Sequence, residues 1–565
     1  MSEEYEFIVV GSGPAGAVLA SRLAKSFKAP KVLLLEAGAA KEPDNTAWLT
    51  DRYTTLAVYP NSNWGYKTGP QTHLDDRVID YSRGKGLGGT SNINFACYTV
   101  GPRDDYDHWA ERVGDSAFNW ENAVKSRESI EHYLLKPGDQ YAKYYNPVEA
   151  VHSTNGSLHV GVPQIWEEGI TEVLDAAEEA GLGIDQDVNS GEGFGLGVVP
   201  ATMTKNYRAT AATAFLSDVP SNLTIVTDSQ ATKILFDGMK AVGLTAGGKE
   251  YRASKEVILS CGAIDTPKLL MLSGVGDKQE LSKHGIDCVL HLPGVGNNLQ
   301  DHLFFSMVWR QHDEFSANRR AGFLSREPAA VEAAKKEFQE HGTGPLAVYF
   351  NSLAMGFFRN DDLLDDTAIS SVPKDLQEHM NRSTVPMFEI VAYAPNMNPT
   401  ANLAHSYLTF LGVLMNPASR GSIKLSSSDP ADPPLADPNF LAHPFDRANA
   451  IATAKKLMQF VETPSLKKTI LEPFNAPTSL SDEDLLAHVK ANGVATWHPS
   501  CTVAMGKEGE EGACVDSDFR LYGAEKLRVV DLSVLPFLIN AHPQSVAYLI
   551  GQIAAQKVIK EYGLD

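Results

Sequence analysis

The first forty residues alternate between short apolar runs and a segment with helical periodicity. Residues 6–10 form a short apolar, β-branched run of the kind found in buried parallel strands. Residues 31–35 form a second such run. Between them, apolar residues recur at helical spacing, and the small ones suit close packing on a sheet: Ala17, Ala20, Ala24 and Phe27. The pattern predicts a strand, a helix and a parallel strand in succession.

Apolar runs elsewhere along the chain predict two groups of strands. Residues 223–226, 233–236 and 257–260 are compatible with further strands of the same parallel sheet. Residues 387–393 and 407–413 predict strands of a second region that contains both sheet and helix, and the acidic, polar stretch 359–366 predicts a surface loop. No internal repeat is visible.

A helix is predicted to start at Thr266-Pro267-Lys268, which follows the run 257–260. Proline near the first turn of a helix costs little, because the N–H that it lacks has no partner within the helix there.

A glycine-rich turn, G-x-G-x-x-G, joins the first predicted strand to its helix. Gly11 permits the tight turn, Gly13 lets the backbone approach a pyrophosphate, and Gly16 allows close packing of helix on strand. Glu36 ends the next predicted strand, where a carboxylate can hydrogen-bond ribose hydroxyls and would repel the 2′-phosphate of NADP. The arrangement predicts a dinucleotide site and leaves FAD and NAD open.

Length and charge narrow the class of protein. A chain of 565 residues exceeds the size at which single cores stop growing, so it is expected to form more than one domain. Its 49 basic and 70 acidic residues give a net charge of −21, which makes nucleic acid and anionic membrane surfaces poor partners. No apolar run approaches the roughly 18–20 residues that span a bilayer. The oligomeric state is left open.

Several familiar chemistries lack their sequence patterns. The five cysteines are scattered without a C-x-x-C pair, and no His, Cys, Asp and Glu residues stand at metal-ligand spacing, so neither a disulfide framework nor a metal is expected. A Ser-His-Asp hydrolase is unsupported, because no G-x-S-x-G turn precedes a suitable helix. The first residues show no basic and apolar regions of a secretory signal, which predicts a cytoplasmic location.

Longer glycine-containing segments carry a family resemblance. Residues 84–107 and 262–276 resemble the two sequence signatures of the glucose-methanol-choline (GMC) flavoprotein oxidoreductases. The resemblance continues at residues 294–302 and again at 527–531, in the order that the family has. It implies an α/β fold in which a Rossmann-like FAD-binding domain is interleaved with an α+β substrate-binding domain. The expected boundaries are 1–150, 221–309 and 491–565 for the FAD domain, and 151–220 and 310–490 for the substrate domain.

The resemblance also implies how FAD is bound. Gly88 and Gly89 offer a backbone without side chains to a flat ligand, and the amides of Asn92 and Asn94 suit the edge of a ring; the family places this segment over the flavin. Asp531 and Pro543, in later matching segments, are further expected cofactor contacts. Some relatives attach the flavin covalently through a histidine where this chain has Ile93, so non-covalent FAD is expected.

Two histidines fall in the family's catalytic motifs. His498 lies in a segment similar to H-P-x-G-T, with Cys501 in place of the glycine, and His542 matches the second catalytic position. An imidazole can accept the hydroxyl proton of an alcohol at neutral pH while hydride passes to the flavin. His498 is therefore predicted to be the general base and His542 its hydrogen-bonding partner. His302 and His108 are interpreted as structural histidines.

Aromatic residues near these motifs suggest the substrate. Trp497 precedes the predicted base, and Phe95 and Tyr98 follow the flavin-contacting segment. A pocket with several rings favours aryl or furanic primary alcohols. The first interpretation is an alcohol oxidase that yields an aldehyde and hydrogen peroxide with oxygen as acceptor. A dehydrogenase that uses a quinone or another organic acceptor, a hydroxynitrile lyase and a non-catalytic flavin-binding protein are the alternatives.

Overall fold

The computed structural model describes most of the chain in detail. It describes residues 3–40, 52, 55–56, 59–135, 138–162, 166, 169–204, 207–313, 321–324, 327–348, 354–363, 368–393 and 405–565.

The first sheet contains the predicted strand–helix–strand unit. Its strands run in the order β6-β2-β1-β9-β8-β7, and β21 pairs with the carboxyl-terminal half of β9. Strand β1 is parallel to both β2 and β9, and helix α1 (Pro14–Ala24) connects β1 to β2. The strand bounds are β1 Glu3–Val10, β2 Val32–Leu35, β6 Leu223–Val226, β7 Ala231–Asp237, β8 Lys240–Ala246, β9 Lys249–Leu259 and β21 Leu527–Val529. The Rossmann-like α/β arrangement is confirmed.

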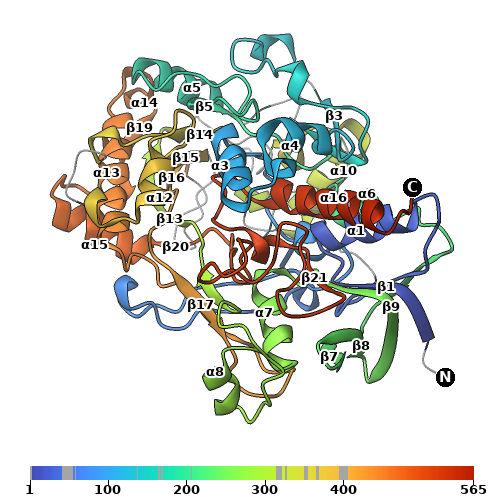
Figure 1. The fold of residues 1–565 in the computed structure, drawn as a ribbon. Coiled ribbons are helices and arrows are strands. Elements are labelled where there is room, and N and C mark those ends of the chain that lie inside the picture. Colours follow the sequence, from blue (N-terminus) through green and yellow to red (C-terminus); the bar gives the residue numbers. More distant parts are fainter. Residues whose placement is uncertain are drawn as a thin grey trace.

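The carboxyl-terminal helix α16 (Gln544–Glu561) packs directly on α1, and the two lie side by side in Figure 1. A Cβ atom on Gly551 of α16 would lie 2.4 Å from the carbonyl oxygen of Ala15, so the helices approach more closely than a side chain would allow. The last helix of the chain is thereby fixed beside the first glycine turn.

Two local predictions were wrong. Helix α1 ends at Ala24, so Phe27 is not on its buried face; it lies in the following turn and is 87% exposed. Helix α7 (Gly262–Leu272) begins before Thr266 and contains Pro267 in its interior. Proline cannot donate to the carbonyl of Ala263, and the Thr502 hydroxyl donates to it instead, at 2.7 Å.

The second sheet is antiparallel and forms the other layer of the molecule. Its strands run in the order β19-β13-β16-β15-β14-β5, and β20 pairs with β13. Their bounds are β5 Gly195–Val198, β13 Leu303–Gln311, β14 Ala354–Phe358, β15 Phe388–Tyr393, β16 Tyr407–Leu414, β19 Ile470–Asn475 and β20 Val494–Ala495. The strands predicted at 387–393 and 407–413 are β15 and β16. Strand β13 starts before the domain boundary that was expected at residue 309, and β20 lies after the one expected at 491.

The central strands of this second sheet are buried on both faces, whereas the edge strand β19 is largely exposed. Helices α13 (Pro444–Phe460), α15 (Asp482–Asn492) and α5 (Ile170–Glu179) cover one face, as Figure 1 shows. The alternate side chains of the central strands, among them Met355, Val391 and Val413, form a separate apolar cluster and line a cavity. The sheet therefore carries a packed core on one side and a wall of the cavity on the other.

Shorter elements surround the two sheets. Part of the expected loop 359–366 forms a turn at Asp361–Leu363, and residues 364–366 lie outside the described residues. The remaining strands are β3 Glu131–Leu135, β4 Leu158–Gly161, β10 Val275–Gly276, β11 Leu290–His291, β12 Asn297–Leu299, β17 Gly421–Lys424 and β18 Leu435–Asp437. The remaining helices are α3 Arg103–Val113, α4 Trp120–Arg127, α6 Ala211–Phe215, α8 Lys278–Lys283, α9 Ala321–Leu324, α10 Pro328–His341, α11 Pro345–Val348, α12 Lys374–Met380 and α14 Pro464–Lys467.

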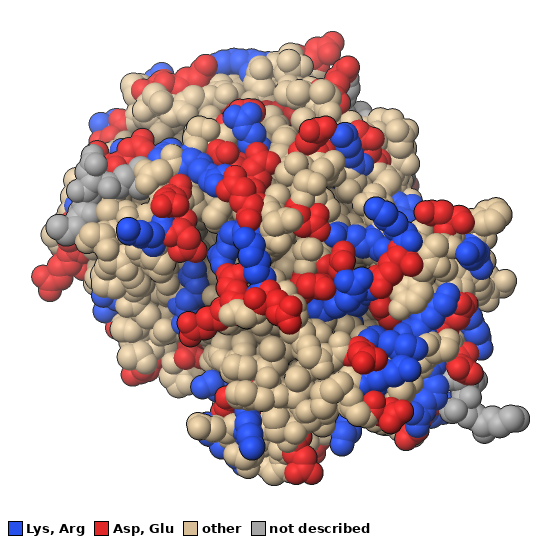
Figure 2. Space-filling view, viewed as in Figure 1, with Lys and Arg blue, Asp and Glu red and all other residues tan. Residues whose placement is uncertain are grey.

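The surface carries both signs of charge. On the face shown in Figure 2, lysine and arginine side chains are interspersed with aspartate and glutamate. Among the described helices, none combines the length and apolar character needed to cross a membrane.

Candidate active site

A cavity of about 280 Å³ lies between the two sheets. Its lining includes the carboxyl ends of β1 and β2, at Val10 and Leu35, and the inner face of the second sheet, at Val391 and Val413. Ligand sites in parallel α/β sheets lie at these strand ends. The predicted dinucleotide site and the inner face of the second sheet therefore line the same cavity.

The first glycine turn forms one end of the cavity. Gly11 has a φ of +99°, and a Cβ there would lie 2.3 Å from the carbonyl oxygen of Ser260. Gly16 lies beneath the turn, where a Cβ would be 2.0 Å from the carbonyl oxygen of Gly11. Gly13, by contrast, lines the cavity and has no atom within 4 Å of a Cβ. The open space at Gly13 lies where α1 begins, which fits the approach of a pyrophosphate to a helix N-terminus.

Glu36 lines the same end of the cavity and is buried. Its Oε2 accepts hydrogen bonds from the amide of Ser12 at 3.1 Å and from the Ser12 hydroxyl at 2.6 Å. Its Oε1 accepts from the amides of Gly38 at 2.9 Å and Gly86 at 3.1 Å. Besides facing the expected ribose, the carboxylate therefore ties the first glycine turn to the second glycine segment.

Only part of the second glycine segment reaches the cavity. Gly89 and Asn94 line it, whereas Gly88 and Asn92 do not. The expectation that Gly88 and Asn92 contact a ligand is therefore corrected. Asn92 is buried and its Nδ2 donates to the Leu87 carbonyl at 2.8 Å, so its side chain stabilises the turn. The Asn94 amide is held as well, since its Nδ2 donates to Gln544 Oε1 at 3.0 Å.

Asp531 and Pro543 both line the cavity, as expected. Asp531 Oδ2 accepts from the amide of Gly262 at 2.9 Å and from the Thr266 hydroxyl at 2.6 Å, at the start of α7. Burial raises the pKa of the Asp531 carboxyl.

His498 and His542 meet at the other end of the cavity, with ring centroids 4.8 Å apart and planes at 79°. His498 Nδ1 is 3.0 Å from the Nδ1 of His302. His542 Nε2 is 2.9 Å from Glu389 Oε1, and because a carboxylate oxygen only accepts, Nε2 carries a proton. Each ring has one nitrogen in contact with another side chain, and among the described residues Nε2 of His498 and Nδ1 of His542 have no such partner and can contact a ligand.

The environment of His498 favours its neutral form. Burial lowers the pKa of His498 well below the usual value, and the neighbouring His542, His302 and Arg83 lower it further. At neutral pH this imidazole is therefore uncharged and has a nitrogen that can accept a proton.

Trp497, next to His498, is held in an unusual conformation. Its φ is +57°, a region that bulky residues rarely adopt. Three contacts hold it: the indole Nε1 donates to Asp80 Oδ2 at 2.8 Å, Arg83 Nη1 donates to its carbonyl oxygen at 2.6 Å, and the Arg52 guanidinium lies 4.5 Å from the ring centroid. Strain of this kind persists where surrounding structure determines it, and here it sets the position of a ring that lines the cavity.

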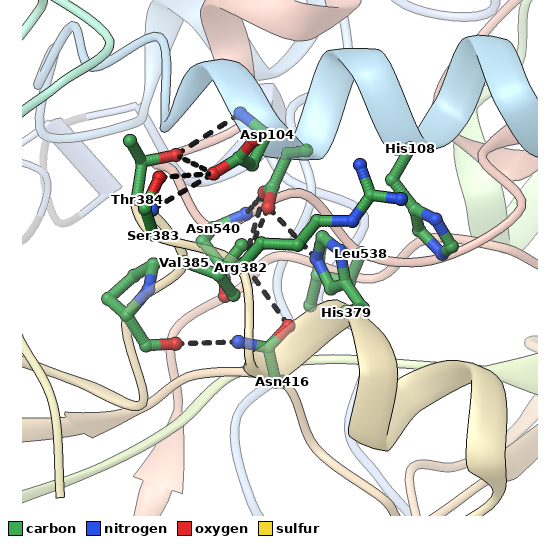
Figure 3. Close-up of polar contacts among 12 residues, drawn as sticks. Asp104, His108, His379, Arg382, Ser383, Thr384, Val385, Asn416, Leu538 and Asn540 are labelled. Carbon is green, nitrogen blue, oxygen red and sulfur yellow. Dashed lines mark hydrogen bonds and ion pairs between the residues drawn. The ribbon is translucent and has the colours of Figure 1, made fainter. Parts of the chain in front are cut away.

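Side chains of two other segments hold the loop before His542, and Figure 3 shows the contact between Asn540 and Asn416. The amide of Asn540 donates to Asp105 Oδ2 at 2.6 Å, and its side-chain Nδ2 donates to Asn416 Oδ1 at 3.1 Å. Asp105 belongs to α3 and also lies 3.0 Å from His379 Nε2 of α12. Asp105, His379, Asn416 and Asn540 are all buried. The backbone that carries His542 is therefore held by α3 and by the segment that contains Asn416.

Sequence models of known families match most of this chain. The amino-terminal and carboxyl-terminal models of the GMC oxidoreductases match residues 5–304 and 417–551. The chain belongs to the GMC oxidoreductase family. Membership implies FAD as the cofactor, and the open cradle at Gly13 with the buried carboxylate of Glu36 fits a dinucleotide.

Individual GMC oxidoreductases resemble this chain over its whole length. An alcohol dehydrogenase [acceptor] from Pseudomonas putida is 33% identical and the match covers 99% of this chain and 96% of the relative. An oxygen-dependent choline dehydrogenase from Staphylococcus xylosus is 31% identical, covering 100% and 96%. The solved structure of a fungal aryl-alcohol oxidase superposes with a TM-score of 0.87 at 25% identity and covers 100% of both chains. These relatives support an enzyme that oxidises alcohols.

The roles of two residues in this GMC oxidoreductase site were not predicted from the sequence. Glu389 of β15, whose Oε1 accepts the hydrogen bond from His542, was not singled out, and His302 was interpreted as structural although it contacts His498. A signal for Glu389 was present, because a single charge inside the apolar run 387–393 predicts a buried carboxylate that needs a partner.

Two further expectations concern residues near the site. Tyr98 does not line the pocket: it is 1% exposed and belongs to the core around the first sheet, so its assignment is corrected. Cys501 has a φ of +72°, which is the conformation that favours glycine. The turn after His498 thus keeps a glycine-like backbone in spite of the substitution. Among the described residues, no group of three or more His, Cys, Asp or Glu side chains is placed to hold a metal ion.

Proposed function

We propose that this GMC oxidoreductase oxidises a primary alcohol, of the aryl or furanic class, to the aldehyde. The observation that carries the proposal is the pair of imidazoles 4.8 Å apart, each with one nitrogen uncommitted, at the end of the cavity opposite the glycine turn. A pair of this kind can hold one hydroxyl group and take its proton.

Bound FAD would supply the hydride acceptor, at N5 of the flavin. The residues proposed to hold it are the cavity-lining members of the two glycine segments, with Glu36, Asn94, Asp531 and Pro543. Non-covalent binding is part of the proposal, because Ile93, at the position where some relatives carry the linking histidine, is an apolar, buried side chain that forms no such bond.

The chain's own residues manage the proton. Nε2 of His498 accepts the hydroxyl proton as the carbon-bound hydrogen leaves as hydride, and Nδ1 of His542 is the nitrogen that can hold the oxygen in position. The His498 ring is buried, which limits the access of water to the nitrogen that takes the proton.

The walls of the cavity support an apolar, aromatic substrate. Apolar side chains make up much of the lining: Phe95, Cys97, Phe304, Met355, Val391, Leu411, Val413 and Trp497. Phe95 and Phe304 each lie with ring centroids 6.1 Å from Trp497, within the range of aromatic pairs. A cationic alcohol such as choline is less suited, because the buried carboxylate of Glu389 is already paired with His542.

For the acceptor we propose oxygen, with hydrogen peroxide as product. A second candidate is a dehydrogenase with an organic acceptor, favoured by the name of the Pseudomonas putida relative. Benzyl alcohol in air, with peroxide detected by a peroxidase-coupled dye, distinguishes the two. Peroxide formation at the rate of alcohol consumption is expected; turnover with a quinone but no peroxide would establish the dehydrogenase.

The His498→Ala variant tests the proposed base. In anaerobic stopped-flow mixing with benzyl alcohol, the variant is expected to keep its FAD and to reduce it at least roughly 100-fold more slowly than the parent enzyme. His341→Ala, at an exposed histidine, is the matched control and should behave as the parent. Undiminished reduction in His498→Ala would refute the base, and cyanide release from mandelonitrile without flavin reduction would instead indicate a hydroxynitrile lyase.

A further inference from the structure

The contact between His302 and His498 has an uncommon geometry. The two Nδ1 atoms face each other at 3.0 Å, with the rings at 83°. Neutral imidazole has one donor and one acceptor nitrogen, so one of these Nδ1 atoms donates and the other accepts. The direction of this bond decides which nitrogen of His498 carries its proton.

The surroundings of His302 do not explain the residue as a structural one. It is 0% exposed, and among the described residues its Nε2 has no hydrogen-bond partner. A buried polar atom without a partner is destabilising, so an apolar side chain of similar shape would stabilise this position better. Unlike an apolar side chain, the imidazole places a hydrogen-bonding nitrogen, Nδ1, beside the proposed base.

The charge state of His302 suits an acceptor. Burial, and then the nearby His542, lower the pKa of His302 to about 3, so the ring stays neutral over the working range of most enzymes. The other groups around His498 are His542, the Arg83 guanidinium, and Asp301, whose Oδ1 accepts from the His498 amide at 2.9 Å. Among the described residues, no other side chain bonds Nδ1 of His498.

We propose that His302 is a positioning residue that holds the proton of His498 on Nδ1, so that Nε2 is free to accept the hydroxyl proton of the alcohol. This inference rests on the proposed function. When the alcohol O–H bond breaks and the N–H bond forms at Nε2, His498 becomes a cation with protons on both nitrogens, and the hydride passes to the cofactor. His302 Nδ1 then accepts from the Nδ1–H of that cation, whose ring is buried.

Three variants of the FAD-loaded enzyme separate this role from packing. His302→Phe removes the acceptor and is expected to slow flavin reduction by benzyl alcohol roughly 100- to 10,000-fold, the range seen when a catalytic imidazole takes the wrong tautomer. Its thermal stability should equal or exceed that of the parent. His302→Asn places an amide oxygen at the position of Nδ1 and should restore the rate to within about tenfold.

The third variant changes a pH profile. In His302→Asp a carboxylate faces Nδ1 of His498 and favours its protonated form, so the acid limb of the reduction rate should move upward by about one pH unit or more. Such a shift would show that the side chain at position 302 acts directly on the charge of His498. His302→Phe reducing at the parent rate, or His302→Asp with an unmoved limb, would overturn the proposal.

A spectroscopic measurement tests the same point without substrate. In ¹⁵N NMR spectra of histidine-labelled holoenzyme, with His498→Ala used for assignment, His498 is expected to carry its proton on Nδ1 in the parent and on Nε2 in His302→Phe. A parent enzyme with the proton on Nε2 would contradict the inference. If His498→Ala retains full activity, the proposed function fails as well; if it is inactive while His302→Phe is fully active, only this inference fails.

Discussion

At the scale of single residues, the site is defined by which nitrogen of each imidazole the protein holds. His542 donates from Nε2 to Glu389, and His498 meets His302 through Nδ1. The carboxylate of Glu389 is fully buried, and among the described residues its Oε2 has no partner. A charge buried in this way is expensive, so its single bond to His542 points to a role in orienting that ring.

The Glu389→Gln variant tests this role. Glutamine keeps the size of the side chain, but its amide can either accept from or donate to His542 Nε2, so the ring loses its defined tautomer. We expect flavin reduction by benzyl alcohol to slow roughly 10- to 1,000-fold while FAD content and melting temperature stay within the range of the parent. Exposed Glu483, substituted in the same way, is the control. A parent-like rate would show that the contact is dispensable.

The sequence predicts some of these site residues and not others. His498 and His542 stand in motifs that recur in order along the chain, and the structure brings them together. Glu389 has no such motif, and its partner lies 153 positions away along the chain, so local patterns say only that a charge is buried there. Tyr98 was misplaced because spacing from the glycine segment does not tell which side of the backbone a ring takes.

At the scale of elements, the floor of the cavity depends on an irregular helix. Helix α7 carries Pro267 in its interior, and the carbonyl of Ala263 would be left without a donor if Thr502 did not supply one at 2.7 Å. The sequence predicts a helix here but places its start too late, because proline is far more frequent in the first turn. The compensating hydroxyl comes from a segment more than two hundred residues away and leaves no local signal.

Two substitutions of Thr502 separate the hydroxyl from the volume of the side chain. Thr502→Val keeps the shape and leaves a buried carbonyl unpaired, which is expected to lower the free energy of unfolding by about 1–3 kcal/mol. Thr502→Ser keeps the hydroxyl and should cost less than the valine variant. Urea unfolding of the FAD-saturated enzyme measures both, and a valine variant as stable as the parent would show that the carbonyl finds another donor.

At the scale of the whole molecule, the cavity exists only where the two sheets face each other. Hydrophobic periodicity predicts the parallel sheet and two strands of the antiparallel one. It does not say which of the two buried faces of those strands meets a helix and which meets the cavity, because both faces are apolar. The walls proposed to select the substrate, at Met355, Val391 and Val413, were therefore beyond sequence reasoning.

Because both sheets line one cavity, we expect the cofactor to stabilise the whole fold. A ligand that binds only the folded state adds about 4 kcal/mol when present at a thousand times its dissociation constant. The melting temperature should therefore fall when FAD is removed and rise again with added FAD. After acid precipitation the yellow flavin should remain in the supernatant, as non-covalent binding requires.

The Gly13→Asp variant supplies the structural control for this experiment. The backbone of Gly13 is extended, with a φ of −65°, and a Cβ there meets nothing within 4 Å, so the substitution should leave the apo fold intact. Its carboxylate would occupy the space at the start of α1 that is proposed for the pyrophosphate, and would repel it. We expect an apo melting temperature like that of the parent but little rise on adding FAD. A variant that binds FAD as tightly as the parent would place the pyrophosphate elsewhere, and flavin that stays with the acid precipitate of the parent enzyme would show covalent attachment.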